Sequence, residues 1–277
     1  MRVALLQTTT GIDPSASAVA ITDAVREAKA GGADMVFTPE MSGLLDRDRA
    51  RAARRIVAED ADPVLAATRA AAAEHRLWVH LGSLALRGDA PDDGRFVNRG
   101  FLIGPDGAIR ARYAKLHLFD VALPDGTEWR ESAGYAPGRA AVAADTPWGR
   151  LGMTICYDLR FPALFGALAQ AGATLFSVPA AFTVPTGRAH WHVLLRARAI
   201  ELGAFVIAAA QTGLHEDGRT TFGHSLVVDP WGTVLLDMGE AAGLEFCDLP
   251  LDDVAAVRGR MPTLQHQRSI GPVTIAP

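Results

Sequence analysis

Residues 151–162 read Leu-Gly-Met-Thr-Ile-Cys-Tyr-Asp-Leu-Arg-Phe-Pro. The first five residues form an apolar run of strand length, and this run ends at Cys156. Pro162 suits the first turn of a helix, which the pattern predicts over residues 162–170, before a second strand over 174–178. Strand, helix and strand in this order indicate a βαβ unit and therefore an α/β protein.

The same alternation runs outward from this stretch toward the N-terminus. Strands are predicted over residues 3–7, 35–38, 78–86, 96–103 and 108–115, and helices over residues 16–30 and 63–75. Ser15 or Ser17 is the expected N-cap of the first helix. The sequence Gly-Pro-Asp-Gly at 104–107 predicts a turn that joins the last two of these strands as a hairpin.

Toward the C-terminus a long helix is predicted over residues 189–202 and a strand over 204–210. Strands over 222–228 and 233–236 flank an Asp-Pro-Trp-Gly turn and predict a second hairpin. βαβ units mixed with hairpins indicate mixed sheets with helices packed outside them. Because no linker or change of composition interrupts the chain, we expect a single domain over residues 1–277.

Composition indicates a folded globular protein. Of 277 residues, 49% are hydrophobic and 21% are charged, which excludes a disordered chain. The net charge is −4, and no Lys/Arg-rich stretch suggests a nucleic-acid partner. The arginine-rich residues 47–55 are accompanied by Asp46 and Asp48, which favours a solvated helix face. No apolar run approaches the ~20 residues of a membrane-spanning helix, so no membrane association is expected.

The chain has two cysteines, Cys156 and Cys247, which is too few for a disulfide framework. Cys247 falls in an apolar C-terminal strand and is expected to be a buried structural thiol. The apolar run at the N-terminus is too short for a signal peptide and is predicted to be a strand. The protein is therefore expected to be cytoplasmic.

Three polar residues follow apolar strands: Glu40, Lys115 and Cys156. Ligands bind at the carboxyl ends of strands in α/β folds. A cysteine between a strand and a helix start is expected to have a lowered thiol pKa from the helix dipole. A carboxylate could take its proton and a lysine could stabilise an oxyanion. Each residue alone is also consistent with a buried thiol or a surface charge, and spacing does not show that the three meet.

Longer motifs around these residues resemble the nitrilase superfamily of carbon–nitrogen hydrolases. Residues 150–162 are similar to the nucleophile motif, Phe-Thr-Pro-Glu at 37–40 to the glutamate motif, and Tyr-Ala-Lys-Leu-His-Leu-Phe at 113–119 to the lysine motif. The likeness continues through residues 189–201 and 223–232 and covers nearly the whole chain.

The resemblance implies a four-layer α-β-β-α sandwich, commonly assembled as a homodimer or higher homo-oligomer through helices, with no cofactor. It implies that Cys156 attacks an amide carbonyl and that Glu40 is the general base. Lys115 and the backbone N–H of Tyr157 would hold the oxyanion, ammonia would leave, and water would hydrolyse a thioester. A second glutamate is expected at Glu131, with Glu128 as a rival.

Within the superfamily the chain is most similar to the deaminated-glutathione amidases and omega-amidases, which implies a small amide substrate that bears a carboxylate. Arg160 is the expected carboxylate anchor, although it could instead pair with Asp158 or Glu131 and brace the site. The other expected substrate contacts are Tyr157, Ala181, Phe182, Thr186, His190 and Trp191. Ala163, Ala180 and Phe222 depart from the family pattern, which puts the substrate in question.

Other functions remain open at this point. An N-carbamoyl amino-acid hydrolase or a nitrilase would use the same three residues, and a non-catalytic binding or scaffold protein could share the fold. A metal site is not expected. His190 and His192 are two residues apart and face different directions on a helix, and His215 and His224 lack supporting cysteines.

Overall fold

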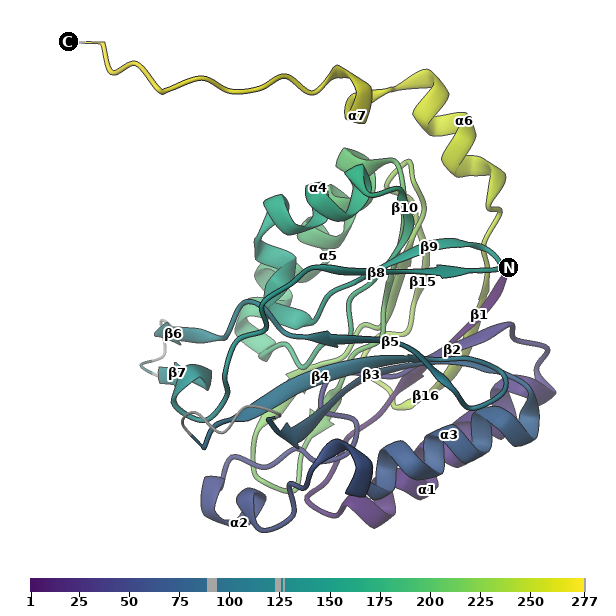
Figure 1. Cartoon of the computed structure of the whole chain (residues 1–277), viewed down its shortest axis with the longest axis vertical. Helices are drawn as coiled ribbons and strands as arrows, with labels where there is room; N and C mark the ends of the chain where they lie inside the picture. Colours follow the sequence, from purple (N-terminus) through teal and green to yellow (C-terminus); the bar gives the residue numbers. More distant parts are fainter. Residues whose placement is uncertain (89–93, 123–125, 127, 277) are drawn as a thin grey trace.

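Two mixed six-stranded sheets stack face to face, and helices cover their outer faces (Figure 1). The computed structural model describes residues 1–88, 94–122, 126 and 128–276. Helices α1 (Pro14–Ala30) and α3 (Pro63–His75) lie on the first sheet, and α4 (Pro162–Gln170) and α5 (Val184–Leu202) lie on the second. The predicted α-β-β-α sandwich is confirmed.

The first sheet has the strand order β16-β1-β2-β3-β4-β5. Strands β1, β2 and β3 are parallel, and the remaining neighbours pair antiparallel. The strands are β1 (Arg2–Gln7), β2 (Met35–Phe37), β3 (Trp78–Arg87), β4 (Phe96–Ile103), β5 (Ile109–Ala114) and β16 (Gly243–Asp248). The predicted hairpin is β4–β5, and Gly107 in its turn has φ +75°, which glycine adopts without strain.

The second sheet has the order β15-β14-β11-β10-β9-β8, with β9, β10 and β11 parallel. Its strands are β8 (Val142–Thr146), β9 (Gly149–Met153), β10 (Ala173–Ser177), β11 (Phe205–Ala208), β14 (Leu226–Val228) and β15 (Val234–Asp237). The predicted second hairpin is β14–β15.

Side chains of successive strand residues alternate between two apolar layers, one between the sheets and one under the helices. In β1, Val3 and Leu5 belong to the core that the two sheets share, whereas Ala4 and Leu6 pack with the cluster under α1 and α3. Successive strand side chains point to opposite faces, so an apolar run buried on both sides is what a central strand requires. The shared core between the sheets supports the proposal of one domain.

Shorter elements and the C-terminal segment complete the chain. The short elements are α2 (Arg49–Ala53), β6 (Asp120–Ala122), β7 (Glu128–Arg130), β12 (Thr212–Leu214), β13 (Thr220–Phe222) and the 3₁₀ helices η1 (Glu59–Ala61), η2 (Glu131–Ala133) and η3 (Cys156–Arg160). After α6 (Asp252–Arg260) and α7 (Thr263–His266) the chain extends away from the body (Figure 1). No helix in the described part of the chain has the length and apolarity needed to span a membrane.

Three details differ from the sequence-based expectations. Helix α1 begins at Pro14 and is capped by the Asp13 side chain, not by Ser15 or Ser17. Helix α5 begins at Val184, five residues before its predicted start, because Pro185 in its first turn needs no hydrogen-bond partner for its nitrogen. The strand predicted over residues 222–228 breaks between β13 and β14, where Gly223 and His224 have positive φ.

Candidate active site

Glu40, Lys115 and Cys156 meet at the edge where the two sheets face each other. Glu40 follows β2 and Lys115 follows β5 in the first sheet, whereas Cys156 follows β9 in the second. The Lys115 Nζ atom lies 2.8 Å from Oε1 of Glu40. The Cys156 thiol and the Glu40 carboxylate line the same cavity and shift each other's pKa, and the Ala181 backbone N–H donates to Oε2 of Glu40 at 3.0 Å. All three catalytic candidates are buried.

Cys156 occupies a sharp turn between β9 and η3. Its φ is +50°, a left-handed conformation that is uncommon for a residue with a side chain. The Cys156 backbone N–H donates to the Pro179 carbonyl at 2.9 Å, which ties this turn to the end of β10. The turn directs the thiol into the cavity that Glu40 and Lys115 also line. Strained backbone of this kind is often found at functional sites.

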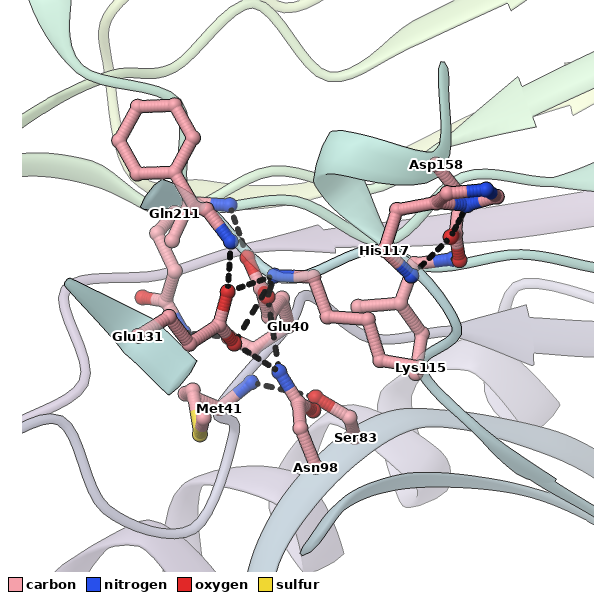
Figure 2. Close-up of polar contacts among 12 residues, drawn as sticks. Glu40, Met41, Ser83, Asn98, Lys115, His117, Glu131, Asp158 and Gln211 are labelled. Carbon is pink, nitrogen blue, oxygen red and sulfur yellow. Dashed lines mark hydrogen bonds and ion pairs between the residues drawn. The ribbon is translucent and has the colours of Figure 1, made fainter. Parts of the chain in front are cut away.

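Glu131 is the second carboxylate at Lys115. Its Oε2 and Oε1 lie 2.9 and 3.1 Å from Nζ of Lys115, so the ammonium is shared between two glutamates (Figure 2). The Phe119 backbone N–H also donates to Oε2 of Glu131, at 2.6 Å. Its rival Glu128 lines the cavity but pairs with Arg130 at 3.4 Å. The structure therefore brings Glu131, not Glu128, to Lys115.

Asn98 is a site residue that the sequence reasoning missed. From β4 its Nδ2 donates to Oε1 of Glu40 at 2.9 Å and to Oε1 of Glu131 at 3.4 Å (Figure 2). It thus bridges the two carboxylates that flank Lys115. No sequence signal would have indicated it, because an asparagine within an apolar strand shows its partner only once the sheet is formed.

Asp158 is a second site residue that the sequence did not indicate, and its role is structural. Its fully buried carboxylate accepts from the Tyr113 hydroxyl at 2.7 Å and from the Ile155 backbone N–H at 2.9 Å. Its other oxygen accepts from the His117 backbone N–H at 3.1 Å and lies 2.7 Å from His117 Nδ1 (Figure 2). Tyr113 and His117 stand on either side of Lys115, so Asp158 fixes the lysine segment to the cysteine turn.

The charges of the site shift the pKa of each group. Burial alone would raise the pKa of Glu40, but the Lys115 ammonium, the nearby Cys156 thiol and the hydrogen bonds from Lys115 and Asn98 hold it below its usual value. Burial would lower the pKa of Lys115, but Glu131 and Glu40 raise it well above its usual value. Glu40 is therefore ionised and Lys115 is an ammonium at neutral pH.

The predicted lowering of the thiol pKa is wrong. Burial raises the pKa of Cys156 well above its usual value, and the Glu40 charge raises it further. Lys115 and the Ala181 backbone N–H oppose this shift but do not reverse it. Cys156 is the first residue of the five-residue 3₁₀ helix η3, and α4 begins only at Pro162, so the sulfur does not adjoin the start of an α-helix. The resting cysteine is a thiol with a carboxylate base in contact.

A cavity of about 460 Å³ opens onto Cys156, which is a typical volume for a small-molecule site. Of the expected substrate contacts, Tyr157, Ala181, Phe182 and Thr186 line it. Its apolar wall also includes Leu44, Leu45, Ile56, Phe96, Phe119, Trp129 and Tyr135.

Arg160, His190 and Trp191 do not line this cavity. Trp191 is fully buried, packs against Phe182 with ring centroids 4.7 Å apart, and donates its indole N–H to the His224 carbonyl. The geometry therefore makes Trp191 a core residue. Arg160 lies 3.3 Å from Nδ1 of His190 and over the rings of Tyr157 and Phe182, at 5.8 and 5.5 Å. Its expected partners Asp158 and Glu131 are not among these contacts.

One cluster of possible metal ligands occurs in the described residues. His192 Nε2 lies 2.9 Å and His224 Nδ1 lies 2.8 Å from oxygens of Asp237. No metal site was expected from the sequence, in which the nearest histidine to His192 is His190. In the folded chain His224 lies beside His192. Each histidine ring hydrogen-bonds the carboxylate, so the cluster is satisfied as it stands. It lies outside the cavity that Cys156 lines.

The family model "Carbon-nitrogen hydrolase" matches residues 2–259. The chain belongs to the carbon–nitrogen hydrolase family. The predicted family, the nitrilase superfamily, is thereby confirmed, and the chain is a hydrolase of carbon–nitrogen bonds.

Curated relatives and solved structures agree with this assignment. The chain is 39% identical over 270 residues to a deaminated glutathione amidase of Yersinia enterocolitica, covering 97% of this chain and 93% of the relative. It is 40% identical to the human enzyme of that name, over 96% and 82% of the two chains.

Among solved structures, the Caenorhabditis elegans NitFhit protein matches with a TM-score of 0.87 and 38% identity. The match covers 96% of this chain and 65% of that larger one. A glutamate-to-glutamine mutant of the amidase from Nesterenkonia sp. AN1, with the acetamide moiety of fluoroacetamide added covalently at its active-site cysteine, matches with a TM-score of 0.80. The two are 29% identical over 97% and 94% of their lengths.

Proposed function

We propose that this hydrolase cleaves a small amide that bears a carboxylate, of the class of deaminated glutathione, through a thioester on Cys156. The observation that carries the proposal is the buried contact of Glu40 with both Cys156 and Lys115 at the cavity floor. Relatives of 39–40% identity that are named for this substrate cover nearly all of the chain. The apolar walls leave room for a substrate of that size.

The charges assign a role to each group. Cys156 begins as a thiol, and Glu40 takes its proton while the sulfur attacks the amide carbonyl. Lys115 stays an ammonium and, with the backbone N–H of Tyr157, stabilises the oxyanion. Glu40 then gives the proton to the departing nitrogen as the carbon–nitrogen bond breaks. For the second half of the reaction Glu40 takes a proton from water, which hydrolyses the thioester and restores the thiol.

The leaving group depends on the amide. A primary amide releases ammonia, as the sequence analysis expected. Deaminated glutathione contains only substituted amides, because each of its amide nitrogens bears a carbon. Its hydrolysis therefore releases an amine, and an assay that detects ammonia alone would miss the reaction.

Trapping the thioester tests the proposal. Wild-type enzyme mixed briefly with substrate and quenched in acid should gain the mass of the acyl group on a peptide that contains Cys156. Cys156→Ser and Cys156→Ala should lose turnover with their unfolding temperatures little changed. Turnover retained in either variant, or an acyl group found on Cys247 instead, would overturn the proposal. Release of CO₂ from N-carbamoyl amino acids, or turnover of nitriles without turnover of amides, would point to the rival superfamily activities.

We also propose a homo-oligomer in the cytoplasm. Val193 and Ile200 on α5 are exposed, as is Trp231 in the adjacent β14–β15 turn, which Arg196 holds by donating to the Gly232 carbonyl at 2.8 Å. These three side chains form an apolar patch that supports self-association. Light scattering of the wild type should give a molecular mass that is a multiple of the chain mass, and Trp231→Glu should give a smaller molecular mass. Two free cysteines agree with a reducing compartment.

A further inference from the structure

Four arginines line the same cavity as Cys156, and we call them the arginine rim: Arg47, Arg49, Arg130 and Arg219. They come from three separate segments, namely the start of α2, strand β7 and the β12–β13 hairpin. Arg47, Arg49 and Arg130 are exposed, and Arg219 is half-buried, whereas Glu40, Lys115 and Cys156 are buried. The rim therefore marks the outer end of the cavity and the catalytic residues mark its floor.

The rim has more positive than negative charge. The acids beside it are already paired: Asp46 with Arg51 at 2.6 Å, Asp217 with Arg219 at 2.7 Å, and Glu128 with Arg130 at 3.4 Å. Within the described part of the chain, Arg47 and Arg49 have no acidic partner. Arg49 instead donates to the backbone carbonyl of Arg130 at 2.7 Å, which holds it at the cavity.

The cavity floor has the opposite balance. It holds two carboxylates, Glu40 and Glu131, against the single ammonium of Lys115. A substrate carboxylate is repelled by this inner end and attracted by the rim, while a neutral amide can approach Cys156. The charge gradient along the cavity thus orients an amide that has a carboxylate at its far end.

Arg219 is the most rigidly held member of the rim. Its Nε donates to Oδ2 of Asp217 at 2.7 Å, and its guanidinium lies over the Trp129 ring at 5.3 Å. Asp217 is itself fixed, because its Oδ2 also accepts from the Arg47 backbone N–H at 2.8 Å. An arginine held in one orientation loses less conformational entropy when its remaining N–H groups bind a planar carboxylate.

We infer that the arginine rim binds the carboxylate of the leaving-group portion of the substrate, with Arg219 as its anchor. This inference rests on the proposed function. In a thioester mechanism the acyl portion stays on Cys156 while the amine departs, so the amine portion faces the opening where the rim lies. The anchor expected from sequence, Arg160, does not line the cavity.

The test compares deaminated glutathione with its C-terminal carboxamide, in which the leaving group is neutral and the acyl group is unchanged. Arg219→Gln should lower kcat/KM for the carboxylate substrate about ten- to a hundredfold, the effect of one charge-assisted hydrogen bond, and change the carboxamide less than about threefold. The double variant R47Q/R49Q should also lower kcat/KM for the carboxylate substrate more than for the carboxamide. The matched control is Arg54→Gln, an exposed arginine of the same segment that does not line the cavity.

Added salt is an independent readout. Raising the ionic strength should raise KM for deaminated glutathione in the wild type more than KM for the carboxamide, because salt screens the attraction between the exposed rim charges and the leaving-group carboxylate. The short amide 2-oxoglutaramate, which has a carboxylate only on its acyl side, should be insensitive to the rim variants.

If Arg219→Gln lowered kcat/KM equally for deaminated glutathione and its carboxamide, the inference would be overturned. A decrease of kcat/KM confined to 2-oxoglutaramate would also overturn it, because it would place the rim against the acyl side. In both cases hydrolysis by the wild type leaves the proposed function standing. No thioester and no hydrolysis of any amide by the wild type would instead refute the proposed function. Circular dichroism and unfolding temperatures that match the wild type are required of every variant compared.

Discussion

The buried Asp158 carboxylate accepts a 2.7 Å hydrogen bond from the Tyr113 hydroxyl, which joins the turn of the proposed nucleophile Cys156 to the segment of Lys115. Asp158 lies two residues after Cys156, and Tyr113 lies two residues before Lys115. The two segments belong to different sheets, so this contact crosses the interface between them. The contact therefore ties the segment that carries Lys115 to the turn that carries Cys156.

Asp158→Asn should disturb this arrangement. Asparagine offers one acceptor oxygen where four donor contacts converge, and its amide N–H groups would face other donors. We expect the free energy of unfolding to fall by about 1–3 kcal/mol, together with a loss in kcat that exceeds the change in KM. Tyr113→Phe, which removes one of these bonds, should lose less in both. Denaturant unfolding and steady-state kinetics measure the two effects, and unchanged kcat in Asp158→Asn would show that the contact does not position Lys115.

The pH dependence of kcat/KM follows from the Glu40–Cys156 pair. The pKa of Glu40 is held below its usual value of 4.5, so the base stays ionised until the pH falls below that value. The pKa of Cys156 is raised well above its usual value. We therefore expect kcat/KM to be flat from about pH 6 to 9, without the inflection near 8.5 of an ordinary thiol. An inflection there would show that a free thiolate is the reacting form.

Glu40→Gln should change both rate and profile. Loss of the general base should lower kcat about 10²–10⁴-fold. Without the Glu40 charge, Lys115 and the Ala181 N–H no longer face an opposing charge, so the thiol pKa should fall. Alkylation of Cys156 by iodoacetamide should then accelerate as pH rises in the variant but stay nearly level in the wild type. Mass spectrometry of the labelled peptide follows this, with Cys247 as an internal reference because burial raises its pKa to about 11.

Glu131 and Glu128 form a matched pair for mutation. Glu131→Gln removes one of two carboxylates at Lys115 and should lower kcat about ten- to a hundredfold. Glu128→Gln removes an exposed carboxylate that does not contact Lys115 and should retain more than about a tenth of the activity. Steady-state kinetics of both variants on one substrate measure kcat. A greater loss of kcat in Glu128→Gln than in Glu131→Gln would reverse the assignment of the second glutamate.

His80 should make the fold sensitive to acid. It lies in β3 against the Phe37 ring, and its two ring nitrogens have no hydrogen-bond partner among the residues that the structure describes. Burial lowers its pKa from 6.5 to about 3. Between these values the unfolded chain binds a proton that the folded chain does not. Neutral His80 therefore leaves the free energy of unfolding at its full value above pH 6.5. This free energy decreases as the pH falls from 6.5 toward 3.

At pH 5 this loss amounts to about 2 kcal/mol in the free energy of unfolding. Urea unfolding at pH 7.5 and pH 5 should show a smaller decrease in His80→Leu than in the wild type. Equal decreases in the two proteins would mean that other groups account for the acid sensitivity.

Sequence patterns predicted most of the fold because they reflect local physics. The α3 helix runs over its predicted residues 63–75, since Pro63 suits a first helical turn and the left-handed Arg76 closes the last one. Conformations set by tertiary contacts were not predictable. His224 adopts a positive φ in the middle of a strand-like run, and that break is visible only in the folded backbone.

The candidate site divides in the same way. Glu40, Lys115 and Cys156 have recognisable surrounding motifs, whereas Asn98 acts through partners 33 and 58 residues away. The thiol pKa depends on how deeply the sulfur is buried and on the distance of Glu40, neither of which spacing along the chain reveals. Of the arginine rim, only Arg47 and Arg49 belong to the run that the sequence predicts to be a solvated helix face, because Arg130 and Arg219 join them only in the folded chain.

The division of the proposed catalytic residues between the two sheets has a consequence during synthesis. The first sheet supplies the base and the ammonium, and the thiol arrives with the second sheet about forty residues after Lys115. A half-folded chain, in which the two sheets are not yet packed together, therefore lacks the groups that assist Cys156. Chemical competence requires the two sheets to be packed together, so the enzyme's own turnover reports that both sheets of a given copy are correctly joined.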